Sequence, residues 1–312
     1  MRIAVIDCGT NTFNLLVVDL KKTSFESVHS SKIPVKLGEG GINNSYINAM
    51  PFQRGVDALI SFKKQINSLN VSQTHAYATS AIRDAKNGIE FKDKVFKESG
   101  INLNIIDGNK EADLIYKGNK LAVHLTNSPS LIMDIGGGST EFIIGNDKEI
   151  FWKKSYRLGA ARLLEKFKPS DPIISDEINQ INTYLLEQLS ELTEAVQKYK
   201  PCELIGSSGA FDSVVEMIQS ELNGEPFIKT KTEYIVENKD YYHISENVIV
   251  STLQQRRNMK GLVEMRVDMI VVSCLLINFV LKNCRINNMR VSTYSLKEGA
   301  LQEIMQNNNV SE

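Results

Sequence analysis

Two stretches of this 312-residue chain share one pattern: IAVIDCGTNTFNLLVVD at residues 3–19 and LIMDIGGGSTEFIIG at residues 131–145. In each, an apolar strand ends in an aspartate, a turn of glycine and small hydroxyl residues follows, and a second apolar strand begins. Such a turn exposes backbone N–H groups and sets a carboxylate beside them, which suits a phosphate with a metal ion. Two such turns predict a clamp on one phosphorylated ligand. The aligned pairs are Asp7 and Asp134, Gly9 and Gly136, and Thr12 and Ser139.

The composition is that of a soluble globular protein. Hydrophobic residues make up 42% of the chain and charged residues 23%, and the length is enough for two domains with separate cores. The net charge is −1, so no global basic field attracts a polyanion and nucleic acid is not an expected partner. Any positive charge that binds phosphate must therefore be local.

Neither end of the chain nor its interior suggests export or membrane insertion. Asp7 interrupts the apolar N-terminal stretch, unlike a signal peptide. The longest apolar run, Met269–Leu281, is too short to span a bilayer and contains Asn278. The four cysteines have no CxxC spacing and lie mostly in apolar runs, so we expect core thiols in a reducing compartment. The cytoplasm is the expected location.

Hydrophobic periodicity predicts two α/β halves that repeat one architecture, each opening with three strands in a meander. The polar segment TNSPS, residues 126–130, is the predicted hinge between them. Residues 224–238 are predicted to be mostly loop. The predicted strands are 2–7, 13–19, 25–31, 74–78, 103–106, 149–155, 203–205 and 289–292, with two more in the hairpin at 131–145, the first of them ending at Asp134. The predicted helices are 50–69, 80–85, 89–98, 109–124, 173–199, 209–222, 245–255, 266–282 and 296–306.

The two aspartates that end the strands are candidate metal ligands. Asp7 and Asp134 would repel a phosphate unless a cation lay between them, and Mg²⁺ (or Mn²⁺) fits that role. Each aspartate could instead cap its own turn through local hydrogen bonds.

Four further features are candidate phosphate or catalytic groups. Arg83 follows a strand and offers a planar fork to phosphate oxygens, or forms a surface cluster with Asp84. Glu111 either complements a helix N-terminus or acts as a general base, and residue chemistry alone favours the first. The GSSG segment at 206–209 joins a strand to a helix, which makes a third candidate anion site. Arg157 and Arg162 either add positive charge near the second turn or lie on a helix surface, and Arg266 is expected to pair with Asp268.

The motifs taken together resemble the exopolyphosphatase/guanosine pentaphosphate phosphatase (Ppx/GppA) family in a short two-domain form. The resemblance rests on DCGTNTFNLLV, ATSAIRDAKN, IDGNKEADLIYKG, DIGGGSTEF, YRLGAARL, GSSGAF and STYSLKEGAL, which follow in the family order. It implies two ribonuclease-H-like domains of the actin, sugar kinase and heat-shock ATPase type around a cleft. The implied domains are 1–125 and 126–295, with helix 296–306 packing back on the first.

The resemblance also implies roles for individual residues. Glu111 matches the catalytic base, which reverses the preference stated above, and Glu141 matches a second acid of the cleft. Asp7 and Asp134 are the expected metal ligands. The residues expected to bind phosphate are Gly9, Thr10, Asn11, Thr12, Arg83, Gly136, Gly137, Gly138, Ser139, Ser207, Ser208 and Gly209.

The expected function is removal of the terminal phosphate of inorganic polyphosphate or pppGpp by water that Glu111 activates. An acceptor-dependent kinase of the same superfamily and a non-catalytic alarmone sensor remain alternatives. The apolar segment 266–282 serves a core or a homodimer contact equally well.

Overall fold

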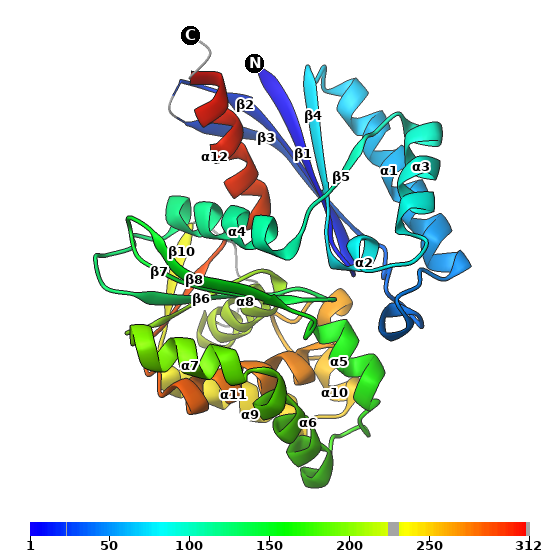
Figure 1. Cartoon of the computed structure of the whole chain (residues 1–312). Coiled ribbons are helices and arrows are strands. Elements are labelled where there is room, and N and C mark those ends of the chain that lie inside the picture. Colours follow the sequence, from blue (N-terminus) through cyan, green and yellow to red (C-terminus); the bar gives the residue numbers. More distant parts are fainter. Residues whose placement is uncertain (23, 224–230, 310–312) are drawn as a thin grey trace.

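The computed structural model describes residues 1–22, 24–223 and 231–309 of the chain. It has two lobes, each built on one β-sheet, with a layer of helices between the sheets (Figure 1). This arrangement confirms the predicted α/β fold with two ribonuclease-H-like sheets. The boundary between residues 125 and 126 lies in the loop between α4 and β6 and stays a prediction.

The first sheet has the strand order β3-β2-β1-β4-β5. β1, β2 and β3 form the expected antiparallel meander, whereas β4 and β5 run parallel to β1. Its strands are β1 (Arg2–Cys8), β2 (Thr12–Leu20), β3 (Phe25–Pro34), β4 (Gln73–Ala78) and β5 (Leu103–Ile105).

The second sheet repeats this topology and adds one strand, in the order β10-β11-β9-β6-β7-β8. β6, β7 and β8 form the second meander, and β9 and β11 run parallel to β6. The strands are β6 (Ser130–Ile135), β7 (Thr140–Gly145), β8 (Ile150–Tyr156), β9 (Leu204–Ser207), β10 (Glu233–Val236) and β11 (Met289–Ser292).

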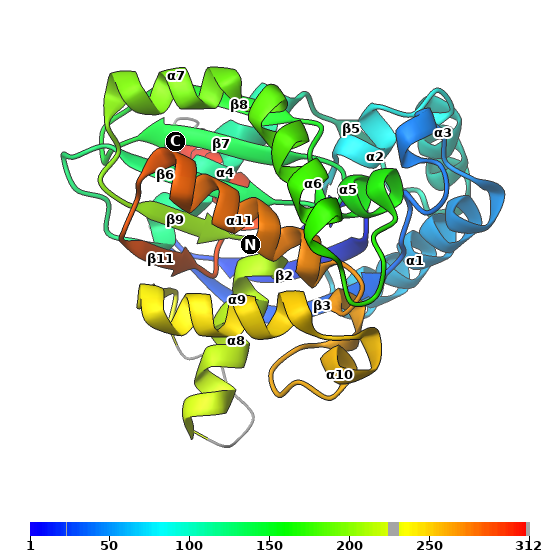
Figure 2. The ribbon, with the colours of Figure 1, turned by 90° about the horizontal axis from the view of Figure 1, so that it is seen from below.

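Helices cover the outer faces of both sheets and fill the space between them. α1 (Ala49–Ser68), α2 (Ser80–Arg83) and α3 (Gly88–Ser99) pack on the outer face of the first sheet. The outer face of the second sheet is covered by the other C-terminal helices, as Figure 2 shows. These are α5 (Ala160–Phe167), α6 (Ser175–Gln188), α7 (Ser190–Tyr199), α8 (Gly209–Asn223), α9 (Asn238–Val250), α10 (Leu253–Arg257) and α11 (Ile270–Cys284). Single 3₁₀ turns lie at Ile42–Asn44 and Glu264–Arg266.

The middle layer consists of α4 (Gly108–Ala122) and α12 (Leu296–Asn309). Strand parity decides which side chains face it, because alternate residues of a strand point to opposite faces. Ile3 and Val5 of β1 pack in this layer, as does Ile132 of β6. The next residues of the same parity are Asp7 and Asp134, so both aspartates lie at strand ends on the inner faces of the two sheets.

α4 and α12 cross in backbone contact, and two glycines allow it. A Cβ added at Gly118 would lie 1.9 Å from the Ser295 carbonyl oxygen, and one at Gly299 would lie 1.8 Å from that of Leu114. The crossing holds Glu111, two turns before Gly118 on α4, in a fixed relation to the first turn of α12. The two helices therefore act as one positioning unit between the lobes.

Replacing Gly299 by alanine is expected to destabilise the protein by about 1–3 kcal/mol, because the added methyl group must push the two helices apart. Urea unfolding measures the change, with Gln306→Ala on the exposed face of the same helix as control. A midpoint equal to that of the wild type would show that the crossing tolerates a Cβ.

One predicted helix is two helices. The expected segment 173–199 is divided into α6 and α7 at Leu189, where φ is −104° and ψ is 20°. The Thr193 hydroxyl donates a hydrogen bond to the Leu189 carbonyl oxygen at 3.2 Å, a contact that often bends helices. Leu185, Leu189 and Leu192 have the i, i+4, i+7 spacing of one helix face, and all three lie in the core across the bend.

Three other element predictions need correction. Residues 233–236, expected to be loop, form the edge strand β10, which pairs antiparallel with β11; residues 224–230 of that expected loop lie outside the described residues. The helix expected at 245–255 begins at Asn238, and a separate helix starts after Thr252, whose hydroxyl accepts a hydrogen bond from Gln255 N. The helix expected at 266–282 begins at Ile270, after a 3₁₀ turn.

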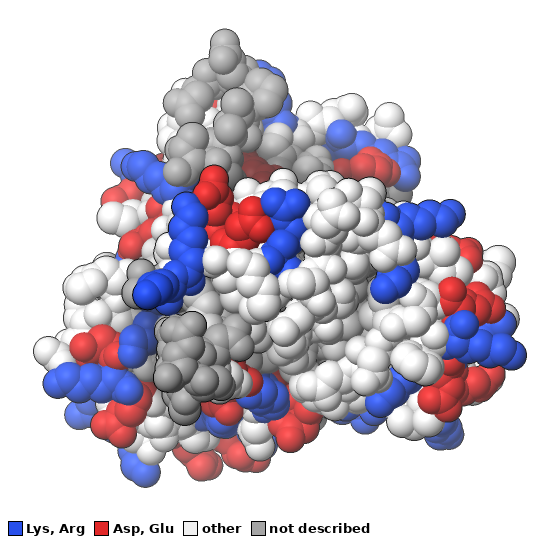
Figure 3. All heavy atoms as spheres, turned by 90° about the horizontal axis from the view of Figure 1, so that it is seen from above, with Lys and Arg blue, Asp and Glu red and all other residues white. Residues whose placement is uncertain are grey.

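The cysteines, the apolar segments and the surface charge can be compared with what the sequence composition predicted. Cys8 and Cys274 are buried free thiols as expected, whereas Cys202 is exposed. Within the described residues, no helix has the length and apolar character needed to cross a bilayer. On the face seen in Figure 3, lysine and arginine are interspersed with aspartate and glutamate. α11 is buried in this chain's own core, so its apolar character does not require a dimer.

Candidate active site

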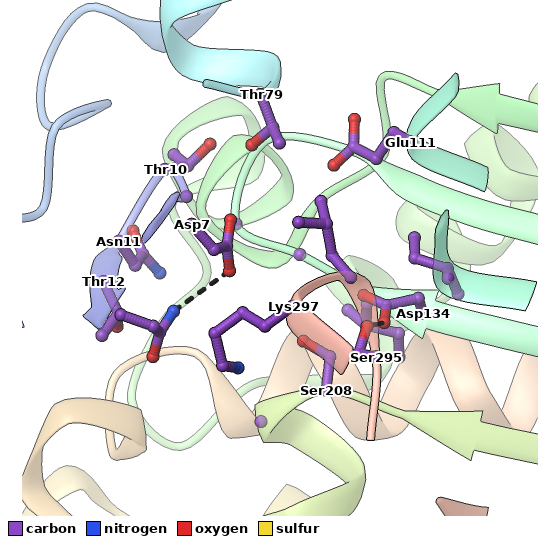
Figure 4. Close-up of a pocket in the computed structure, with 18 of the residues that line it drawn as sticks. Asp7, Thr10, Asn11, Thr12, Thr79, Glu111, Asp134, Ser208, Ser295 and Lys297 are labelled. Atoms are coloured by element: carbon purple, nitrogen blue, oxygen red, sulfur yellow. Dashed lines mark hydrogen bonds between the residues drawn. The ribbon is translucent and has the colours of Figure 1, made fainter. Parts of the chain in front are cut away.

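The two Asp–Gly turns lie face to face. The first turn, residues 7–12, and the second turn, residues 134–139, line one cavity of about 340 Å³ between the lobes (Figure 4). A Cβ added at Gly137 would lie 2.9 Å from Thr10 Cβ, and one at Gly138 would lie 2.5 Å from Thr10 Oγ1. The glycines of the second turn are therefore needed for the close approach of the two turns across the cavity.

The two turns repeat each other in geometry as well as in sequence. A Cβ at Gly9 would lie 3.0 Å from the Thr12 carbonyl oxygen, and a Cβ at Gly136 would lie 3.0 Å from that of Ser139. The strand register is also equivalent, because Asp7 pairs with Asn14 and Asp134 pairs with Glu141. The repeat is therefore chemically asymmetric at one position, where the first lobe has an amide and the second an acid.

Both strand-end aspartates lie in the cavity wall, Asp134 buried and Asp7 partly exposed, and both are held by groups outside their own turns. Asn14 Nδ2 donates to Asp7 Oδ2 at 3.1 Å, and Ser207 Oγ donates to Asp134 Oδ2 at 2.7 Å, as does Ser295 Oγ. Burial raises the pKa of Asp7 to about 6, with Lys297 opposing the shift and Asp134 adding to it. Burial likewise raises the pKa of Asp134, against the serine hydrogen bonds. Neither side chain caps its own turn, which was the alternative considered from the sequence.

Glu111 reaches the cavity from the first turn of α4 and is 6% exposed. Asp107, not Glu111, caps this helix, accepting a hydrogen bond from Lys110 N at 2.8 Å. The Glu111 carboxylate instead accepts a 2.6 Å hydrogen bond from Arg83 Nη1. Burial and then the charge of Glu141 raise its pKa well above the usual value, although Arg83 opposes them. A carboxylate of raised pKa is a stronger base than an exposed one.

Glu141 lies in the cavity wall with 1% exposure. Ser155 Oγ donates to its Oε1 at 2.7 Å, and burial together with the charge of Asp134 raises its pKa to about 7. α4 comes close to this acid because its first residue, Gly108, packs directly on Ser155, where a Cβ would lie 2.5 Å from the serine Cβ. The structure thus brings Glu111 and Glu141 into one site from different lobes.

The comparisons with known proteins identify the family. Residues 16–308 match the model of the Ppx/GppA phosphatase family. The chain belongs to this family.

Relatives cover nearly the whole chain. An exopolyphosphatase crystal structure from Cytophaga hutchinsonii is 38% identical, with 98% of each chain covered and a TM-score of 0.95. Exopolyphosphatase 1 of Mycobacterium tuberculosis is 28% identical, covering 96% of this chain and 87% of the relative. The Ppx/GppA family member of Aquifex aeolicus shares the fold, with 23% identity, 99% coverage of each chain and a TM-score of 0.81. The predicted family is confirmed, and membership supports a phosphatase that acts on polyphosphate.

The charge of the cavity in this Ppx/GppA member favours a bound cation. Among the described residues, six carboxylates and three cationic side chains line it, although the expected substrate is itself an anion. No group of three or more His, Cys, Asp or Glu within the described ranges is close enough to hold a metal ion by itself. Mg²⁺ typically takes one or two carboxylates and completes its octahedron with water and phosphate oxygens. Asp7 and Asp134 fit that pattern, so the residues present suit such an ion.

The third candidate anion site and the arginines lie at different distances from the cavity. Ser208 and Gly209 line the cavity. Ser207 does not line it and instead donates a hydrogen bond to Asp134. Arg83 is not in the wall and contacts the site through Glu111. The expected pairing of Arg266 with Asp268 is wrong. Asp268 pairs with Lys36 at 3.1 Å, and Arg266 packs on Gly209 and lines the cavity.

The other two arginines join the lobes beside the site. Arg162, 6% exposed, donates to the carbonyl oxygens of Gly138 and Ile42 at 3.0 and 2.7 Å and to Asp84 at 3.2 Å. Arg157 also pairs with Asp84, at 3.1 Å. Neither lines the cavity, and Arg162 is not a helix-surface residue. Both link α2 of the first lobe to the chain around α5 of the second.

Several cavity residues were not predicted. The alignment of the two turns contained a signal for one of them, since Asn14 is the counterpart of Glu141. Ser295 and Lys297 lie in STYSLKEGAL, which the family resemblance included without giving either a role. No local pattern singles out the remainder. The unpredicted lining residues include Asn14, Thr79, Ser80, Asp212, Arg266, Ser295, Lys297 and Glu298.

Proposed function

We propose that this protein removes the terminal phosphate of inorganic polyphosphate or pppGpp by metal-assisted attack of water. The observation that carries the proposal is that two Asp–Gly turns and Glu111 meet in one cavity between the lobes. Family membership supports the chemistry, because relatives are named exopolyphosphatases. The cytoplasm and a homodimer stay predictions.

The turns would hold the terminal phosphoryl group. Glycine at positions 9, 136, 137 and 138 leaves room for phosphate oxygens beside the backbone, and the hydroxyls of Thr10, Thr12 and Ser139 lie at the same wall. A bound Mg²⁺ or Mn²⁺, held by Asp7 and Asp134, would supply positive charge to the phosphate oxygens.

Glu111 would serve as the general base. It would accept a proton from the water whose oxygen attacks the terminal phosphorus, while the bridging P–O bond breaks and releases the shortened chain. Arg83 would orient the Glu111 carboxylate through the 2.6 Å contact, and its direct contact with a phosphate stays a prediction. Glu141 would help to orient the water.

Phosphate release tests the function directly. The purified protein is expected to release phosphate from tripolyphosphate, longer polyphosphates or pppGpp in Mg²⁺ or Mn²⁺, and to lose this activity in EDTA. The ratio of rates among these substrates decides between polyphosphate and pppGpp. ADP formation from ATP that depends on an added acceptor, with no phosphate release, would favour the kinase. Tight alarmone binding without turnover would favour the sensor.

A further inference from the structure

Lys297 is a cation for which the described part of the chain provides no hydrogen-bond partner and only a distant carboxylate. Its side chain is 18% exposed and comes from the first turn of α12. Among the described residues its Nζ makes no hydrogen bond, and its one ion pair is a loose 4.0 Å contact with the adjacent Glu298. Most half-buried ammonium groups have hydrogen-bond acceptors, because burying an unpaired charge is costly.

The position of Lys297 in the cavity suggests why its ammonium has no hydrogen-bond acceptor within the described residues. It lines the cavity, and Figure 4 shows its side chain running from α12 to a place below Asp7. Burial opposes its protonation, but Glu298, Asp7, Asp212 and Asp134 outweigh that effect and raise its pKa. The group is therefore charged at neutral pH, and it lies in the wall of the cavity that both turns line.

We infer that Lys297 is a substrate-contacting residue, whose ammonium binds the non-bridging oxygens of the phosphoanhydride chain held between the two turns. The inference rests on the proposed function and adds a specificity-determining group to it. A flexible ammonium donates up to three hydrogen bonds to oxygens in varied positions. It would also offset part of the carboxylate excess around the bound anion.

The helix crossing fixes this contact. Gly299, two residues after Lys297, lies in backbone contact with α4, the helix that carries Glu111. One packed helix pair thus positions both Glu111 and Lys297, although they are 186 residues apart in sequence. The other two cations of the lining are Lys32 on β3 and Arg266 in the 3₁₀ turn before α11, so neither is positioned by this helix pair.

The test uses imidodiphosphate, in which NH replaces the bridging oxygen, so that binding is measured without turnover. Calorimetry in Mg²⁺ compares the wild type with Lys297→Met, Lys297→Arg and Lys154→Met. Lys154 pairs with Glu191 on the outer side of the second lobe and serves as a control for the loss of one positive charge. Lys297→Met is expected to bind about 10–100-fold more weakly, the usual effect of losing a hydrogen bond to a charged group. Lys297→Arg should recover most of the affinity, and Lys154→Met should match the wild type.

Equal affinity of Lys297→Met and the wild type, or no wild-type binding at all, overturns the inference. Thermal melts check that each variant is folded, and Lys297→Gln gives the same comparison should the methionine variant not fold. Failure of the proposed function looks different: a wild-type protein that binds imidodiphosphate but releases no phosphate from any polyphosphate or pppGpp would refute hydrolysis. In that case the affinities of the Lys297 variants still decide the contact.

Discussion

Replacing Glu111 by glutamine is expected to slow phosphate release by about 10²–10⁴-fold, the usual effect of removing a positioned general base. Glutamine has nearly the same shape, and its carbonyl oxygen can still accept the hydrogen bond from Arg83. Its amide cannot accept the proton of the attacking water. Steady-state phosphate release with polyphosphate, and with pppGpp, measures the loss.

Binding separates this role from a structural one. The affinity of Glu111→Gln for imidodiphosphate in Mg²⁺ should stay within a few-fold of the wild type, because the two turns and Lys297 are unchanged. Glu98→Gln is the matched control, since Glu98 lies on α3 and pairs with Lys94 away from the cavity. Near-normal turnover by Glu111→Gln would show that another group acts as the base, with Glu141 the next candidate.

Replacing Gly138 by alanine is expected to lower kcat/KM by about 10²-fold, because a displacement of about 1 Å in a reacting group can have that effect. The added Cβ would lie 2.5 Å from Thr10 Oγ1 and 2.6 Å from Ser80 Oγ. Both neighbours belong to the first lobe, so the methyl group must separate the two turns that, in the proposed reaction, would hold the terminal phosphoryl group. Phosphate release at low substrate concentration measures the change.

Gly100→Ala is the control, because glycine is favoured at this position only by its backbone conformation and not by close packing. Gly100 ends α3 with φ of +70°, and an added Cβ would meet nothing within 4 Å. This variant should lose stability, because alanine is disfavoured at positive φ, but keep its activity per folded molecule. If Gly138→Ala behaved in the same way, the approach of the two turns would not matter for the reaction.

The two lobes contribute unequally to the site. At the position where the first repeat has Asn14, the second has Glu141, so only one strand-end aspartate has an acid beside it. Asn14 donates a hydrogen bond to Asp7, whereas in the second lobe the charge of Asp134, after burial, raises the pKa of Glu141. Glu141 and Glu111 both line the cavity, and the charge of Glu141 adds to burial in raising the pKa of Glu111. We therefore propose that the first turn mainly anchors the ligand, whereas the reaction takes place where Glu111 of α4 and Glu141 of β7 meet.

The sequence alone determined the repeated fold and the position of the two turns. The two apolar runs placed Asp7 and Asp134 at the ends of strands, and the glycines marked where the backbone turns. These are local properties, readable from neighbouring residues because strand geometry and glycine's freedom act over a few positions. The same repeat also pairs Asn14 with Glu141, a difference visible in the printed chain.

Only the tertiary structure decided which charged groups meet. A helical arginine such as Arg83 has the same local pattern whether it faces solvent, a phosphate or Glu111, which lies 28 residues away. Asp268 pairs with Lys36, 232 residues away, rather than with nearby Arg266. Lys297 reaches the cavity because α12 crosses α4 at Gly118 and Gly299. Such partners depend on how distant elements pack, and the energy of that packing is spread over two sheets and the helices between them, so no short stretch of sequence records it.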